Sequence, residues 1–204
     1  MRATIALLSV LFLGCTASSD YMKAAEAPRA LAAPPDAALV VFVRYEDGAI
    51  IDNITLFTDR GRFLGDVPPD SWFVATLSPG DYIFLGRGQH PSPLVAQLAP
   101  GRVYFVEVAL EHHTWGASSE NATRMLKLYP RGPRAPEWQR VLLAMEEAQF
   151  NQADLAGGQA EIDAKRAVFE RLAFEAREDL SDDDEETQRA RTLPAEWGVA
   201  SFQR

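Results

Sequence analysis

The sequence is poor in residues that build covalent or metal-bound frameworks. Its 204 residues include a single cysteine, Cys15, and only three histidines. One cysteine cannot form a disulfide within one chain, so the sequence is not that of a disulfide-stapled secreted domain. His112 and His113 are neighbours at the end of a predicted strand and point to opposite faces, so they cannot chelate one metal together. Glu111 shares a face with His113, but one carboxylate and one imidazole fall short of a zinc site.

Catalytic motifs are missing as well. The chain has no H-E-x-x-H, G-x-S-x-G or P-loop motif and no complete dinucleotide-binding motif. Ser92 stands near His90, but no acid is placed to orient the histidine and the loop is broken by prolines. We therefore expect no catalytic residues, no metal and no cofactor.

Basic residues are fewer than acidic residues, and most of the difference lies in the C-terminal third of the chain. Up to residue 136 the chain has 12 basic and 13 acidic residues, whereas from residue 137 onward it has 8 and 16. The net charge is −9. An acidic C-terminal region argues against binding of nucleic acid and against electrostatic attraction to anionic lipid.

A hydrophobic run long enough to span a membrane is also absent. The N-terminal apolar run, Ala3 to Leu13, follows Arg2, carries no charge and has eleven residues. A spanning helix needs about 20, but this length suits the apolar core of a secretory signal peptide. The sequence therefore predicts a signal peptide over residues 1–14.

The end of that run resembles a bacterial lipobox. The letters LFLGC place the small residue Gly14 directly before Cys15. Lipidation of this thiol, followed by acylation of the freed amine with chains such as palmitate, would attach the protein to a membrane. Thr16 in place of Asp after the cysteine resembles outer-membrane sorting, which favours the outer membrane facing the periplasm. The alternative is an ordinary signal peptide that is cleaved further on and leaves no cysteine.

The segment after the cysteine reads as a linker over residues 15–35. Lys23 to Pro35 contains six alanines and three prolines in thirteen residues, which favours a spacer over a packed element.

Residues 36–130 read as a run of short strands. Asp36 to Arg44 is a continuous apolar segment, typical of a central strand. Pro-Gly pairs at 79–80 and 100–101 predict type II turns, because glycine supplies the positive φ that such turns require. On the strand after the second pair, Tyr104, Val106 and Val108 should share one face and Phe105 and Glu107 the other. With no room for crossover helices, we expect an antiparallel β-sandwich of seven to eight strands.

The segments ALVVFVR, ITLFTDRGRFLGDV, WFVATLSPGDYIF and APGRVYFVEV resemble a family of bacterial predicted lipoproteins of unknown function. The likeness covers about residues 36–110 and rests on Gly65, Pro79, Gly80, Gly101 and Tyr104. It implies a transthyretin-like or carboxypeptidase-regulatory-like β-sandwich. It implies no catalytic residues.

Residues 136–204 are expected to form an acidic helical tail. Trp138, Val141, Leu142 and Met145 fall on one helical face, and Gly157-Gly158 is expected to end that helix. A second helix is predicted from Gln159 to Arg177, so that the two form a hairpin.

A short third helix is expected after the acidic run Glu178 to Glu186. Ser181 and Asp184 match a capping box, and Glu185 is placed to pair with Arg189. A solvated loop is the alternative for this run.

The ligand-binding candidates are Trp115, His113 and Glu111, at the loop of residues 112–123. A tryptophan among polar residues can hold a sugar ring or a partner's backbone, although it can also fold back onto the core. The sequence thus favours a non-catalytic binding or scaffolding module of the bacterial cell envelope, partnered by its membrane and by another envelope protein or a glycan. The alternatives are a periplasmic hydrolase or carbohydrate-active enzyme that uses Asp and Glu, and a carrier of a small apolar ligand, with a cavity lined by residues such as Phe150, Phe169 and Leu172.

Overall fold

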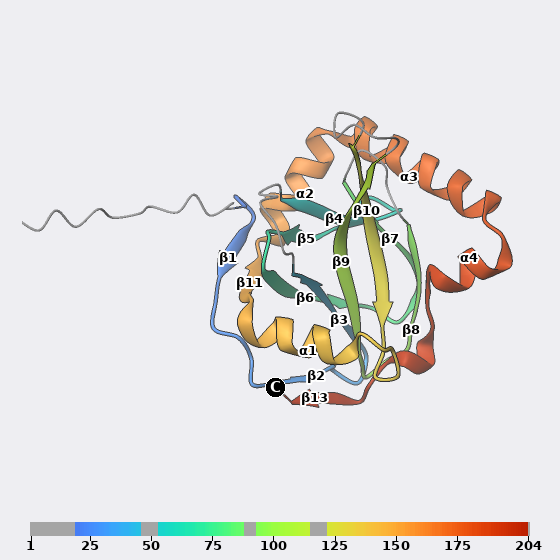
Figure 1. Ribbon diagram of the computed structural model, residues 1–204. Helices are drawn as coiled ribbons and strands as arrows, with labels where there is room; N and C mark the ends of the chain where they lie inside the picture. The colour runs from blue at the N-terminus through green and yellow to red at the C-terminus, as the bar shows by residue number, and fades with distance from the viewer. Residues whose placement is uncertain (1–18, 46–52, 88–92, 115–121, 204) are drawn as a thin grey trace, which may run out of the picture.

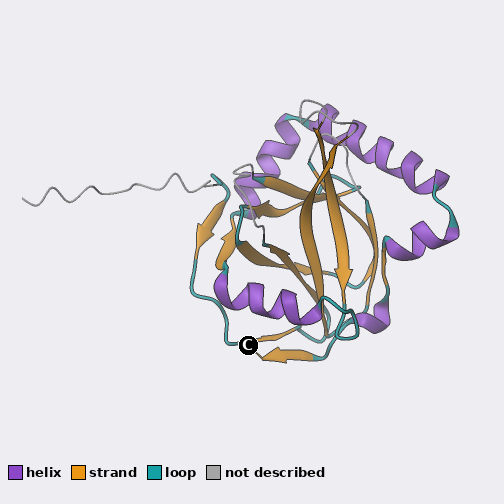
Figure 2. Ribbon diagram, in the orientation of Figure 1, coloured by secondary structure: helices purple, strands orange, loops and turns teal. Residues whose placement is uncertain are grey.

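The computed structural model describes residues 19–45, 53–87, 93–114 and 122–203. These residues are mainly β, with four α-helices that lie outside the sheets (Figure 2). Eight strands form between residues 38 and 131, as the sequence predicts. They are β3 Ala38–Arg44, β4 Ile54–Thr58, β5 Phe63–Val67, β6 Ser71–Leu77, β7 Gly80–Gly86, β8 Leu94–Leu98, β9 Arg102–Thr114 and β10 Ala122–Arg131.

The remaining elements come from the two ends of the chain (Figure 1). At the N-terminal side they are β1 Met22–Ala24 and β2 Ala30–Ala32. At the C-terminal side they are α1 Trp138–Glu147, β11 Gln149–Ala153, α2 Leu155–Ala164, α3 Arg166–Asp182, α4 Glu185–Ala190, β12 Thr192–Leu193, the 3-10 helix η2 Ala195–Trp197 and β13 Ser201–Gln203.

Two main sheets share one hydrophobic core. The first has the order β1-β11-β6-β3-β9-β10 and the second the order β12-β8-β7-β4-β5, while β13 and β2 make a small third sheet. Every residue of β3 is buried, as expected of a central strand. Val40 and Phe42 of β3 belong to the same buried cluster as Leu56 and Phe84 of the second sheet, and the Phe42 and Phe84 rings meet edge to face at 5.5 Å.

The expectation of antiparallel pairing throughout is wrong. β3 pairs with β9 in parallel, and so do β11 with β6 and β12 with β8. Parallel neighbours need a connection that returns the chain to the same end of the sheet, and a helix is only the commonest way to make it. Between β3 and β9 the return is made by strands, because β4, β5, β7 and β8 lie in the other sheet.

Of the two turns predicted at Pro-Gly pairs, the one at Pro100-Gly101 is consistent with the structure, where Gly101 has φ of 65°. The other does not form as predicted, because Gly80 is the first residue of β7 and its φ of 139° is far from the value of about 80° that a type II turn requires. The predicted faces of β9 are also confirmed, because Tyr104, Val106 and Val108 enter the core between the sheets while Phe105 lies in the cluster on the other side.

From Ser19 on, the segment expected to be a linker is part of the folded body. β1 pairs with β11, and β2 pairs with β13. Leu31 is buried in the cluster beneath α1. Alanine- and proline-rich composition describes what a segment prefers locally, but here the backbone hydrogen bonds of distant strands fix its conformation.

The C-terminal region is not an appendage either. β11, β12 and β13 each extend a different sheet, and β11 occupies residues expected to be helical. Gly157-Gly158 lies inside α2 and does not end a helix, and the long second helix is divided at Lys165 into α2 and α3. The helical hairpin is therefore replaced by helices that alternate with sheet-completing strands.

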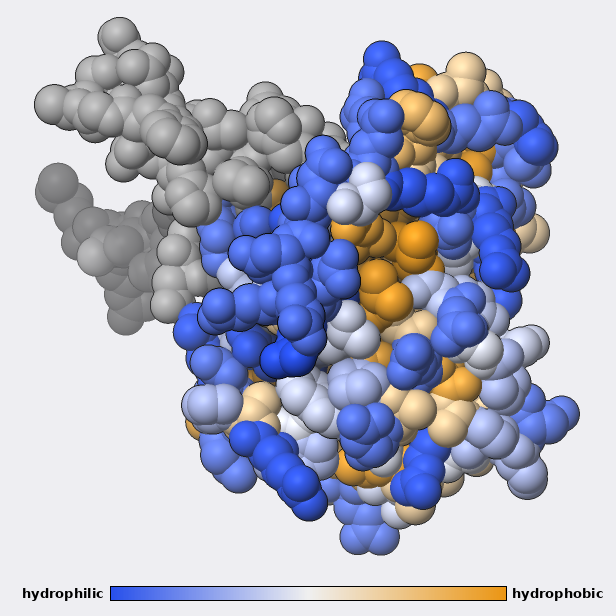
Figure 3. All heavy atoms as spheres, turned by 90° about the vertical axis from the view of Figure 1, so that its right-hand side faces the viewer, coloured by the Kyte–Doolittle hydropathy of each residue, from blue (hydrophilic) through white to orange (hydrophobic). Residues whose placement is uncertain are grey.

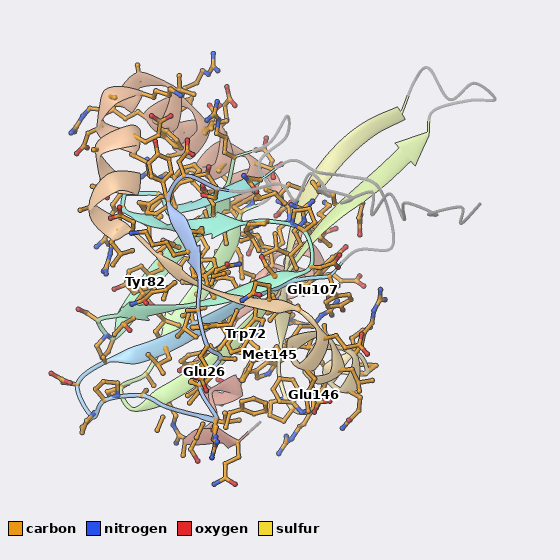
Figure 4. The ribbon with its side chains drawn as sticks, turned by 90° about the vertical axis from the view of Figure 1, so that its left-hand side faces the viewer. Glu26, Trp72, Tyr82, Glu107, Met145 and Glu146 are labelled. Atoms are coloured by element: carbon orange, nitrogen blue, oxygen red, sulfur yellow. The ribbon has the colours of Figure 1, made fainter. Side chains whose placement is uncertain are left out.

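The helices cover the outer faces of both sheets. α1 covers the first sheet, where Met145 and Val141 are buried with Trp72 and Phe105, and Figure 4 shows Trp72 and Met145 side by side. On the second sheet, α2 and α3 bury their predicted inward residues against Phe57, Phe63 and Leu85. Those inward residues are Ile162, Phe169, Leu172 and Ala176. Apolar surface remains visible at the centre of the face that carries α3 and α4 (Figure 3).

The third helix is confirmed as α4, with a different cap. Asp184 is its N-cap and accepts a hydrogen bond from the Thr187 backbone N–H at 2.7 Å. Ser181 lies in the last turn of α3, where its hydroxyl donates to the Glu178 carbonyl. The predicted Glu185–Arg189 ion pair is present.

Candidate functional site

The ligand site expected from the sequence lies at the far end of β9. Glu111 and His113 are both in β9, where they stand opposite Met125 and Thr123 of β10. The Glu111 carboxylate accepts a hydrogen bond from the Tyr129 hydroxyl. Trp115 lies outside the described residues, as does Cys15. The ligand site and the lipidation site therefore stay predictions.

Glu111 belongs to a row of charged and aromatic side chains on the outer face of the first sheet. Next to it, the Arg131 guanidinium contacts Glu107 Oε2 at 2.5 and 2.6 Å and Glu137 Oε2 at 3.1 Å. The same guanidinium lies 4.8 Å from the centre of the Tyr129 ring. Figure 4 shows Glu107 on the sheet just above α1. These contacts join β9, β10 and the start of α1.

The phenols of this row are strongly biased toward their neutral form. Burial raises the pKa of Tyr45 and of Tyr129 above the usual tyrosine value, and the neighbouring carboxylates, Glu107 and Glu111 respectively, raise it further. A neutral phenol beside a carboxylate donates a hydrogen bond and is a poor nucleophile. The row is therefore suited to fixing structure and less suited to chemistry.

An open cleft lies between the second sheet and the helices that cover it. It has a volume of about 390 Å³ and is bordered by the β4–β5 turn, α2 and α3. This lies within the range of roughly 300–1,000 Å³ that small-molecule sites occupy. The lining side chains on α3 recur at helical spacing along one face, and they are Arg166, Phe169, Glu170, Ala173 and Arg177.

The β4–β5 turn is held against α2 by a glutamine. Gln159 Nε2 donates to the Gly61 carbonyl at 2.9 Å, and its Oε1 accepts from the Phe63 backbone N–H at 2.9 Å. Gly61 takes a φ of 74°, which glycine adopts without strain. Two hydrogen bonds from one side chain thus fix the border of the cleft.

The rim of the cleft is charged, and part of that charge is already neutralised. Arg177 contacts both the backbone carbonyl and the carboxylate of Asp59, at 2.9 and 3.0 Å. Arg166 contacts Asp163 at 3.1 Å. Within the described residues, the side chains of Arg60 and Glu170 make no hydrogen bond or ion pair. One cation and one anion on the rim therefore remain available to a ligand.

The floor of the cleft is apolar, but it is not the cavity expected of an apolar carrier. Phe169 and Ile162 line it. Phe150 is on the other sheet, where its ring packs against Trp72 at 4.5 Å, and Leu172 is buried in the core beneath α3. The structure therefore brings only Phe169, of the three expected residues, to this cleft.

Sequence reasoning missed the residues that border the cleft. Arg60 and Gly61 read as an ordinary turn, and Gln159 as a helix start. The available signal was weak: a charged turn after an apolar strand, and a polar residue beside the Gly157-Gly158 pair. Nothing local indicates that these segments, about 98 residues apart, meet.

Two further features bear on function. Among the side chains that the structure describes, no three His, Cys, Asp or Glu residues are grouped to hold a metal ion. None of the described helices is long and apolar enough to cross a bilayer.

Comparison with known proteins gives no relative. No family model matches the chain, and neither a curated protein nor a solved structure matches it significantly.

Proposed function

We propose that this chain is a lipid-anchored protein of the bacterial cell envelope that binds another envelope component and catalyses no reaction. The anchor part of the proposal rests on the sequence, in which the apolar run Ala3 to Leu13 is followed by Gly14 and Cys15. Acylation of Cys15 at more than one position would make the attachment stable.

The start of the folded body suggests how such an anchor would work. Ser19 Oγ donates to Asp66 Oδ2 at 2.5 Å, and the Tyr21 ring meets the Phe63 ring edge to face at 6.1 Å. Ser19 is the fourth residue after Cys15, and a chain of that length reaches at most about 14 Å. An acylated chain would therefore hold its folded body close to the bilayer. The side of the body that carries Tyr21, α2 and the cleft would then lie nearest to the membrane.

The observation that carries the binding part is the cleft beside α3. It combines an apolar floor, a fixed border and two rim charges, those of Arg60 and Glu170, that the described residues leave unpaired. Polar groups placed around an apolar floor fix the orientation of a bound ligand. A ligand with groups of both charges fits this rim best.

We extend the proposal to the fold. Two sheets with a shared core support a β-sandwich of the transthyretin-like kind, as the resemblance of residues 36–110 implies. The parallel β3–β9 pair is the feature that a related structure would have to share.

The anchor is tested by fractionating cells that express the full chain or its Cys15→Ser variant. We expect the native chain in the membrane fraction, with an acylated N-terminal peptide beginning at Cys15 in its mass spectrum. The Cys15→Ser variant should leave that fraction. If the native chain were unmodified and began beyond Cys15, the proposal of a lipid anchor would be wrong.

Binding is tested by placing a photoreactive amino acid at Asp163, an exposed position that lines the cleft and leaves both rim charges in place, and, as a control, at the distant Gln203. The Asp163 position should crosslink a discrete envelope protein or glycan in living cells, and Glu170→Gln should weaken that adduct. Equal labelling from both positions, or none from position 163, would contradict a role for the cleft.

A further inference from the structure

A second cavity lies at the other end of the molecule, near the C-terminal strand. It has a volume of about 410 Å³ and lies between the connection from β10 to α1 and the 3-10 helix η2. η2 leads into β13, which lies at the bottom of Figure 1, whereas α2, which borders the first cleft, lies in its upper part. The cavity is lined by Gly132, Pro133, Arg134, Glu196, Trp197, Gly198 and Val199.

The Trp197 indole is supported from behind by a glycine. A Cβ added at Gly132 would lie 3.0 Å from Trp197 Cδ2 and Cε3, so the ring rests directly on the backbone there. Any side chain at position 132 would push the ring away. One side of the indole is thus packed, while 37% of the residue remains exposed.

The turn that carries the indole is rigid. The Tyr104 hydroxyl donates to the Ala195 carbonyl at 3.0 Å and accepts from the Ala99 backbone N–H at 2.8 Å. Val199 exchanges two backbone hydrogen bonds with Val103, at 2.8 and 3.0 Å. Trp197 therefore sits on a backbone fixed by β9, and binding would cost little ordering of the site.

Trp197 differs from the other two tryptophans that the structure describes. Trp72 is fully buried, and Trp138 packs edge to face on Phe105 at 4.8 Å in the core beneath α1. Trp197 instead opens into a cavity beside two exposed charged residues, Arg134 and Glu196. In the described part of the chain, neither of these makes a hydrogen bond or an ion pair.

We propose that this cavity binds a saccharide, with one sugar ring stacked on Trp197. The C–H face of a pyranose packs against an aromatic face, and the sugar's hydroxyl groups need both donors and acceptors at its edge. Arg134 has donors only and Glu196 has acceptors only, so together they meet both needs. Trp is well suited to such a site because it presents a large apolar surface.

Other small ligands suit the cavity less well. A purely apolar ligand would remove water from two charges without replacing their hydrogen bonds. A cationic ligand would gain from the indole, but its repulsion by Arg134 would offset its attraction to Glu196, so its charge would add little. A neutral, hydroxyl-rich ring avoids both costs.

This inference goes beyond the proposed function, because it assigns a second binding site with a ligand class of its own. The site stands apart from the anchor and from the cleft beside α3. Saccharide binding is measured on purified protein, so it can succeed whether or not Cys15 is acylated. Its failure would leave the fractionation result of the anchor test unchanged.

The test is calorimetric titration of the full-length chain with three tetrasaccharides, those of N-acetylglucosamine, maltose-type glucose and cellulose-type glucose. We expect at least one to bind. Exchange of Arg134→Gln or Glu196→Gln should weaken that binding about tenfold, as expected for lost hydrogen bonds to charged groups. Both residues are exposed, so neither exchange should lower the melting temperature. Leu143→Ala, at an exposed position on α1, is the matched control and should bind as the native chain does.

The platform role of the indole is tested separately. Trp197→Tyr keeps an aromatic face and should retain most of the affinity, whereas Trp197→Leu keeps apolar bulk without that face and should lose at least about tenfold. Equal affinity of the two variants would overturn the stacking. The proposal is also overturned if no tetrasaccharide binds, or if a proline-rich peptide binds the Trp197 cavity while the sugars do not.

Discussion

Tyr45 and Tyr129 are the residues whose ionisation the fold changes most clearly. Burial and the neighbouring carboxylates of Glu107 and Glu111 raise the pKa of both phenols. The folded protein therefore keeps two protons that the unfolded chain releases above about pH 10. Stability from this source is complete below that pH and is lost as the pH rises further.

We predict that exchanging both residues for phenylalanine makes the free energy of unfolding depend less steeply on pH above about pH 9. The free energy of unfolding in urea should fall from pH 9 to pH 11 in the native chain, and fall less steeply in the Tyr45→Phe, Tyr129→Phe double variant. Tyr82→Phe is the control, because the Tyr82 hydroxyl donates to a surface carbonyl, that of Ser78. Equal slopes for the native chain and the double variant would contradict the prediction.

At the scale of elements, α2 shows how contact with a sheet overrides a local signal. Two consecutive glycines favour a helix end, yet Gly157 and Gly158 lie in the first turns of α2. A Cβ at Gly158 would lie 2.1 Å from the buried Phe63 ring of β5. The glycine is required there because the helix approaches the strand so closely.

We predict unequal effects for the two glycines. Gly158→Ala should destabilise the protein by about 1–3 kcal/mol, since the added Cβ would force the buried Phe63 ring out of its packing. At Gly157 the nearest atom to an added Cβ is Asp154 Oδ2 at 3.0 Å, and this carboxylate caps α2 by accepting the Gly157 backbone N–H at 3.1 Å, so it can shift only slightly. Gly157→Ala should therefore be close to neutral, because the gain of up to about 1 kcal/mol in helix propensity is offset by strain at the cap. Urea denaturation measures both, and a Gly158→Ala variant as stable as Gly157→Ala would disprove the close approach.

Elements were predictable where the local pattern and the tertiary environment agree. The all-apolar β3 and the alternating β9 formed as expected. β11 was missed, because QFNQA has no clear strand pattern and extends a sheet between β1 and β6, two strands far from it in sequence. At the candidate sites, Phe169 was predicted to face inward, but its meeting with Arg60 and Gly61 depends on the packing of α3 against the β4–β5 turn.

At the scale of the whole molecule, the strands and the helices depend on one another. The β-region of residues 36–130 has its outer face covered by α1, and its two sheets are extended by β11 and β12. Without those elements, Trp72, Val41 and Phe105 would be exposed to water, and two sheet edges would be left open.

We predict that a fragment of residues 36–130 does not fold by itself, whereas residues 19–204 do. The shorter fragment should lack a cooperative thermal transition by circular dichroism and should give poorly dispersed amide resonances. The longer one should melt in a single cooperative step. A cooperative transition in the shorter fragment would show that the C-terminal region is dispensable for folding.

The sequence by itself determined the apolar strands of residues 38–131, the inward faces of the helices, the acidic bias of the C-terminal region and the expectation of a lipidated Cys15. These depend on local periodicity and composition, which act over a few residues. Only the tertiary structure decided the parallel β3–β9 pair, the use of both chain ends to complete the sheets, and the two cavities at Phe169 and Trp197. Those features arise from backbone hydrogen bonds and close packing between segments far apart in the chain, for which a short stretch of sequence carries no signal.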